Sequence, residues 1–105
     1  EMIRVNYTEM DSAGGPTLRL EARGHAGYAP AGQDIVCAAA SILMEAAAAV
    51  LREEQTPILD IRGKGLHMIT AGGDSGALET ARQGLSLLAR HYADHVQIRD
   101  LRTRR

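Results

Sequence analysis

GHAGYAPAGQDIVCAAAS, residues 24–41, connects the end of an alternating segment to the start of a helical one. It contains the single cysteine of the chain, Cys37, and a histidine twelve positions before it, His25. Glycine and proline residues lie between the two, which is typical of a flexible loop. A thiol and an imidazole at the two ends of such a loop can fold together as nucleophile and base, so the stretch predicts a reactive site.

A helix is expected directly after this loop. Apolar residues recur there at intervals of three and four, and Asp34, just before them, is a candidate N-cap. Cys37 then falls in the first turn, where free backbone N–H groups and the helix dipole favour the thiolate and lower the thiol pKa. The same N–H groups are candidates for an oxyanion hole. We expect the buried stripe of this helix to comprise Ile35, Val36, Ala39, Ile42, Leu43, Ala46, Ala49 and Val50.

Each residue of this predicted site also has a structural interpretation. Cys37 could be a small buried apolar residue of an alanine-rich helix. Asp34 could cap the helix or orient a protonated His25, although its charge beside a thiolate would raise the thiol pKa. Ser41, one turn after Cys37, either contacts the site or bonds back to the helix backbone.

The loop contains two further candidates for substrate binding. Gly27 permits backbone angles that other residues avoid, and Tyr28 follows it directly. The aromatic ring of Tyr28 could close as a lid over a bound peptide. The alternative is a tyrosine that only packs against its own loop.

The remaining segments alternate between apolar and polar residues, which predicts strands. The first two are joined by a turn containing Gly14, Gly15 and Pro16, so they are expected to form a hairpin. Gly63 to Gly65 separates the next pair in the same way. The expected strands are residues 2–9, 16–24, 57–65, 65–72 and 96–101.

A second helix is expected before the last strand, with Asp74 or Ser75 as its cap. Its apolar face comprises Leu78, Ala81, Leu85, Leu88 and Tyr92. The element order is then β-β-α-β-β-α-β. Hairpins combined with two amphipathic helices predict an α+β fold, with a mostly antiparallel sheet and both helices packed on one face. The whole chain, residues 1–105, is expected to form a single domain.

Composition narrows the classes of function. A net charge of -1, with 24% charged residues, favours neither a dedicated nucleic-acid-binding domain nor a membrane-surface protein. A lone cysteine suits a reducing compartment, and no apolar run is expected to reach the roughly 20 residues of a membrane span. We therefore expect a cytoplasmic protein.

A pair of histidines near the end of the chain is the one candidate for a metal site. His91 and His95 are one helical turn apart with Asp94 between them. A stable site needs further ligands, and the sequence offers no clear third one. We expect no metal or other cofactor, and we expect these residues to form a solvated helix end.

The central stretch resembles the ribosomal-processing cysteine proteases, the Prp family. The features that carry the resemblance are the spacing from His25 to Cys37, GHAGYA after a strand, and GQDIVCAAAS at the start of a helix. The resemblance implies that Cys37 is the nucleophile and His25 the general base. Asp34 and Ser41 occupy motif positions.

The resemblance also implies a substrate and a partner. Members of the family remove an N-terminal extension from the precursor of large-subunit ribosomal protein twenty-seven, by cleavage after aromatic residues, and a homodimer is expected. Two other functions stay open at the level of sequence. One is a ribosome-associated module that binds the same precursor without cutting it, and the other is a redox sensor that uses the thiol.

Overall fold

The computed structural model describes residues 1–30, 32–72 and 76–102. The expected hairpin is present as β1 (Ile3–Ser12) and β2 (Gly15–Arg23), which pair antiparallel along their full lengths. Gly15 closes the turn with a φ of 113°, an angle that side chains rarely tolerate. The second hairpin is β3 (Ile58–Gly63) with β4 (Leu66–Gly72), so both predicted hairpins are confirmed.

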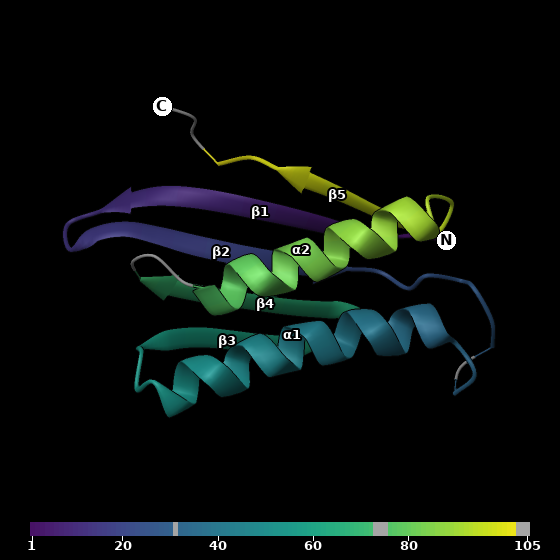
Figure 1. Cartoon of the computed structure of the whole chain (residues 1–105), viewed down its shortest axis with the longest axis horizontal. Coiled ribbons are helices and arrows are strands. Elements are labelled where there is room, and N and C mark those ends of the chain that lie inside the picture. Colours follow the sequence, from purple (N-terminus) through teal and green to yellow (C-terminus); the bar gives the residue numbers. More distant parts are fainter. Residues whose placement is uncertain (31, 73–75, 103–105) are drawn as a thin grey trace.

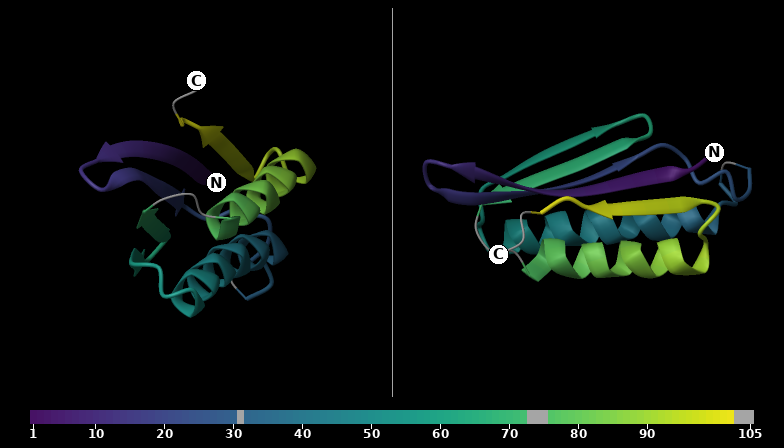
Figure 2. Two further views of the ribbon diagram at one scale, coloured as in Figure 1. Left: turned by 60° about the vertical axis from the view of Figure 1, so that its left-hand side comes forward. Right: turned by 90° about the horizontal axis from the view of Figure 1, so that it is seen from above.

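The five strands form one sheet in the order β3-β4-β2-β1-β5 (Figure 1). Three of its strand pairs are antiparallel, and β5 (Val96–Asp100) runs parallel to β1. The two helices, α1 (Ile35–Glu53) and α2 (Gly76–His91), lie side by side on the same face of the sheet (Figure 2). The predicted α+β fold and its element order are confirmed.

The core lies between this sheet face and the helices. Alternate residues of the strands point into it because successive side chains of a strand leave on opposite faces. Ala26, from the loop after β2, also lies in this core and has no exposed surface. The largest fully buried side chains are Tyr7, Leu20, Met44, Leu51, Ile69, Leu78, Leu85, Val5, Val36 and Val96.

The predicted buried stripe of α1 is wrong at most positions, although Val36 is buried and Leu43 is partly buried against the core. Ile35 is 57% exposed, Ile42 is 62% exposed and Val50 is 42% exposed. This helix is apolar on most of its circumference, so the spacing of apolar residues does not identify the face that packs. The buried residues are Val36, Ala40, Met44, Ala47, Ala48 and Leu51.

By length and composition α1 is also long enough and apolar enough to cross a membrane. This corrects the expectation that no apolar run reaches that length. The core helix of a soluble protein passes the same test, and six residues of α1 are buried against the rest of the fold. The length of α1 therefore carries no conclusion about membranes.

The predicted face of α2 is confirmed: Leu78, Ala81 and Leu85 are buried, and Leu88 and Tyr92 pack against the same core. Its expected caps, Asp74 and Ser75, lie outside the described residues.

The expectation that His91 and His95 form a solvated helix end holds for His91, which is exposed, and is wrong for His95. α2 ends at His91, and His95 lies in the following turn, where it is partly buried. The backbone N–H of Ile3 donates to the carbonyl of His95 at 2.9 Å. This bond fixes the α2–β5 turn beside the start of β1 (Figure 1).

Candidate active site

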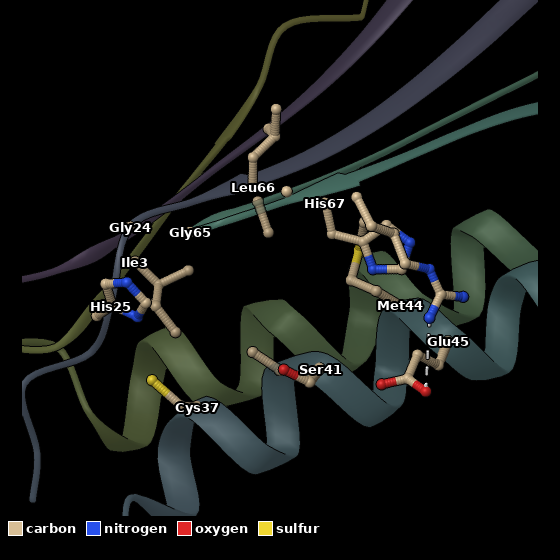
Figure 3. Close-up of a pocket in the computed structure, with 14 residues that line it drawn as sticks. Ile3, Gly24, His25, Cys37, Ser41, Met44, Glu45, Gly65, Leu66 and His67 are labelled. Carbon is tan, nitrogen blue, oxygen red and sulfur yellow. Dashed lines mark ion pairs between the residues drawn. The ribbon is translucent and has the colours of Figure 1, made fainter. Parts of the chain in front are cut away.

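Cys37 and His25 line one cavity of about 250 Å³ between α1 and the ends of the strands. In Figure 3, Cys37, Ser41 and Glu45 lie along one side of α1, because residues four apart share a helix face, and His25 faces the thiol from the end of β2. The other walls come from the start of β1 and from the β3–β4 turn with the first residues of β4. The structure thus places the Cys37 thiol and the His25 imidazole, which the sequence predicted to meet, in the lining of the same cavity.

The Cys37 thiol is partly buried, and the backbone N–H of Ala26 donates to its Sγ at 3.3 Å. Burial raises the pKa of Cys37, the hydrogen bond from Ala26 opposes this effect, and the negative charge of Asp34 adds to it. The net shift is upward. The prediction of a lowered thiol pKa is wrong because desolvation and the neighbouring Asp34 carboxylate outweigh the hydrogen bond from Ala26.

Asp34 performs the predicted capping role and a second one. Its Oδ1 accepts the N–H groups of Val36 at 3.0 Å and Cys37 at 2.9 Å, so it is the N-cap of α1. Its Oδ2 accepts the N–H groups of Tyr28 at 3.0 Å and Ala29 at 3.4 Å. The N–H of Cys37, followed by those of the loop, lowers the Asp34 pKa although partial desolvation opposes them. One carboxylate therefore joins the loop to the helix that carries the thiol.

The same hydrogen bonds correct the expected oxyanion hole. The N–H groups of Val36 and Cys37 are occupied by Asp34 Oδ1, and that of Ala38 donates to the Asp34 carbonyl at 3.1 Å. These donors at the start of α1 already have acceptors, so they are not free to receive an oxyanion. Among the described residues, no hydrogen bond joins Asp34 to His25 either.

Two glycines, Gly24 and Gly65, determine where the His25 ring lies. Gly24 has a φ of 93°, and a Cβ there would lie 2.5 Å from the carbonyl oxygen of Met2. Its N–H donates to the carbonyl of Gly65 at 2.8 Å, which joins the end of β2 to the β3–β4 turn. A Cβ on Gly65 would lie 3.3 Å from His25 Nε2, so the ring rests directly on this turn. The close approach to Gly65 is a feature that sequence reasoning missed.

The remaining predicted residues divide between the cavity and the loop. Ser41 is exposed and lines the cavity beside Cys37. Gly27 has a φ of 65°, as expected for a glycine with an unusual backbone angle. The Tyr28 ring meets Tyr92 and His95 edge-on, each with 5.4 Å between ring centroids. Among the described residues, those lining the cavities do not include Tyr28, so in this structure its ring is turned towards the α2–β5 turn.

A second, larger cavity of about 750 Å³ meets the first at the thiol. His25, Cys37 and Ser41 line both of them. The second cavity is otherwise formed by the loop and the neighbouring N-terminal residue: Glu1, Gly27, Ala29, Pro30, Gly32, Asp34 and Ala38. The residue that carries the thiol therefore borders both cavities.

The first cavity ends in a group of charged residues that the sequence did not suggest. Glu45 pairs with Arg62 at 3.7 Å, and His67 Nε2 donates to Asp60 at 2.8 Å. Arg52 also donates to Asp60 at 2.6 Å. Burial alone raises the pKa of Asp60, but the hydrogen bonds from Arg52, His67 and Arg62 outweigh it and lower the pKa. In the sequence, the one signal for this end of the cavity was a charged residue, Asp60, at an inward position of β3.

The family model of the cysteine protease Prp matches residues 2–97, which include both cavities' central residues. The chain belongs to the cysteine protease Prp family. Membership in the Prp family makes the chain a cysteine protease, the class of enzyme that the resemblance implied. A comparison with curated proteins found no match.

Solved structures share the Prp fold over nearly the full chain. The essential ribosomal processing protease Prp from S. aureus, with a covalently linked product peptide, has a TM-score of 0.80 at 21% identity, covering 94% of this chain and 99% of that chain. With a substrate peptide, the same protease has a TM-score of 0.74 at 19% identity, with the same coverages. SMU.848 from Streptococcus mutans has a TM-score of 0.68 at 23% identity, covering 98% of this chain and 97% of that chain.

We expect the free enzyme to react slowly with thiol reagents at neutral pH. The upward shift of the Cys37 pKa leaves little thiolate there, and the thiolate is the reactive form. Alkylation by iodoacetamide can be followed by mass across a pH series, because Cys37 is the single cysteine. The pH midpoint of alkylation should lie above the midpoint of the same chain unfolded in urea. A midpoint below that of the unfolded chain would mean that His25 and the helix start stabilise a thiolate in the free enzyme.

Proposed function

We propose that the enzyme removes the N-terminal extension of the precursor of large-subunit ribosomal protein twenty-seven, with Cys37 as nucleophile and His25 as general base. The observation that carries the proposal is that Cys37 and His25 both line two adjoining cavities. An endopeptidase must hold chain on both sides of the scissile bond. The S. aureus protease that shares the fold is described as a ribosomal processing protease, which supports the choice of substrate.

The raised thiol pKa favours a mechanism in which the proton moves during attack. Sγ of Cys37 attacks the scissile carbonyl carbon while His25 accepts the thiol proton. The tetrahedral intermediate collapses, the C–N bond breaks, and the His25 imidazolium gives the proton to the leaving amine. Water then attacks the thioester with His25 as base again, which releases the new carboxyl end and restores the thiol.

The oxyanion of the intermediate needs a donor other than the occupied N–H groups of α1. The N–H of Ala26 already donates to Sγ at 3.3 Å. In the intermediate the sulfur has formed a bond to carbon and is a poorer acceptor, and the new negative charge lies on the adjacent oxygen. We therefore assign the Ala26 N–H as one donor to the oxyanion.

We further propose that the enzyme is a cytoplasmic homodimer. The sheet face away from the helices carries exposed apolar residues on β3, with Leu59 at 55% and Ile61 at 39% exposure. A second copy would cover such a patch. Light scattering across a range of protein concentrations measures the mass in solution, and a monomer at all concentrations would contradict the dimer.

The test of the function is cleavage of the extended ribosomal precursor by the purified enzyme, with product masses as the readout. We expect one internal bond of the extension to be cut, and no product with Cys37→Ala. The same Cys37→Ala protein should still bind the precursor. An intact precursor that binds equally to both proteins would instead indicate a binding module, and reversible oxidation of Cys37 with no cleavage would indicate a redox sensor.

A further inference from the structure

We propose that His95, in the turn between α2 and β5, is a positioning residue that holds Ala26 so that its N–H points at the Cys37 sulfur. The inference rests on the proposed function because it takes Cys37 as the nucleophile. It assigns a role to a histidine that lies 58 positions after Cys37 in the sequence.

The first observation is the bond between His95 and the loop. His95 Nδ1 lies 2.8 Å from the carbonyl oxygen of Ala26. A carbonyl only accepts, so Nδ1 must carry the proton and donate it. Both the Nδ1–H neutral tautomer and the imidazolium carry this donor.

The second observation is that Ala26 is held at three points. Its side chain is fully buried, its carbonyl accepts from His95, and its N–H donates to Cys37 Sγ. Loss of the His95 donor would leave a polar group of a buried residue without this partner, and such a group costs free energy until it finds water. The peptide around Ala26 would then turn, and the N–H would leave the sulfur.

The third observation is that His95 itself is rigidly placed. Its N–H donates to the carbonyl of Tyr92 at 2.8 Å, and its carbonyl accepts from the N–H of Ile3 at 2.9 Å. Its ring also meets the Tyr28 ring edge-on, at an interplanar angle of 81°. His95 therefore holds the loop at a fixed place relative to the end of α2 and the start of β1, which pack in the core.

The consequence for the reaction follows from the neighbours of Ala26. The preceding residue is His25, so a displaced Ala26 also moves the backbone that carries the general base. The N–H to Sγ bond is the one that lowers the Cys37 pKa against burial and the charges of Asp34 and Glu1. Loss of His95 should thus affect thiol acidity and the rate of the chemical step together, with less effect on substrate binding.

Two substitutions test the hydrogen-bond donor of His95 and its aromatic ring independently. His95→Phe keeps an aromatic ring against Tyr28 but has no donor, whereas the side-chain amide of His95→Asn places an N–H near the position of Nδ1. We expect His95→Phe to raise the pH midpoint of Cys37 alkylation by iodoacetamide and to lower kcat by about 10- to 100-fold. We expect KM to change by less than about twofold. His95→Asn should bring both the alkylation midpoint and kcat most of the way back to the values of the parent.

Parent-like alkylation and kcat in a folded His95→Phe would overturn the proposal, as would a folded His95→Asn that is impaired as strongly as His95→Phe. If His95→Phe does not fold, nitrogen NMR of the imidazoles in the parent decides: protonated Nδ1 on His95 supports the proposal, and the Nε2–H tautomer overturns it. Alkylation and NMR need no substrate. A parent that cleaves no precursor would therefore refute the proposed function, while these measurements would still judge His95.

Discussion

Replacing Cys37 by serine should lower kcat/KM for precursor cleavage by about 10⁴-fold or more, because the hydroxyl is a far weaker nucleophile than the thiol when His25 is the base. Serine has nearly the same shape as cysteine, and its oxygen can still accept the N–H of Ala26, which now donates to Sγ at 3.3 Å. The fold should be unchanged, with the same thermal unfolding midpoint. Rates are measured by mass or by a fluorogenic peptide that spans the cleaved bond.

His25→Ala should lower kcat/KM by about 10²- to 10⁴-fold, the range that general acid–base catalysis supplies. The double variant Cys37→Ser with His25→Ala should be no slower than Cys37→Ser alone, since residues that act as one unit lose their effect together. Additive losses in the double variant would show that the two residues act independently. Residual activity of Cys37→Ser within tenfold of the parent would remove Cys37 from the role of nucleophile.

Replacing Asp34 by alanine should reduce both stability and activity, because one carboxylate accepts four backbone N–H groups. Oδ1 caps α1 through Val36 and Cys37, and Oδ2 holds the loop through Tyr28 and Ala29. We expect a lower unfolding midpoint from the lost cap. We expect kcat/KM to fall by about 10- to 100-fold, because the loop that carries His25 and Ala26 is released.

Asp34→Asn is the matched control. The side-chain carbonyl oxygen of asparagine can keep the cap. The amide NH2 that replaces Oδ2 only donates, so it does not accept the N–H groups of Tyr28 and Ala29, and the negative charge is lost. This variant should stay close to the parent in unfolding midpoint and lose activity as Asp34→Ala does. Full activity of Asp34→Asn would mean that the loop contacts are dispensable.

The pH dependence of stability gives a further check on the same residue. The folded-state pKa of Asp34 is lowered, so its carboxylate stabilises the fold above the unfolded pKa, about 3.9, and this contribution is lost as pH falls through the folded value. The difference in unfolding midpoint between the parent and Asp34→Ala should be present at neutral pH. It should shrink below pH of about 4, which thermal unfolding followed by circular dichroism would measure.

The sequence alone determined those features that depend on neighbours along the chain. Alternation over residues 2–9 and 16–24, with Gly14 and Gly15 between them, predicts a hairpin because side-chain direction and turn chemistry are local. The structure has this hairpin as Ile3–Ser12 and Gly15–Arg23. Asp34 as N-cap and Cys37 in the first turn followed from the same logic. The motif around His25 and Cys37 was sufficient to indicate the Prp family.

Tertiary structure decided what depends on residues that are distant in the chain. The packing face of α1 was ambiguous because most of its circumference is apolar, and only contact with the sheet and α2 selected Ala40, Met44 and Ala47. The thiol pKa rises because burial and the Asp34 charge together outweigh the hydrogen bond from the Ala26 N–H. The bond from His95 to Ala26 spans 69 positions, and the parallel pairing of β5 with β1 brings the two together. No local pattern encodes such a contact, because the chain on either side of His95 specifies only where a helix ends and a strand begins.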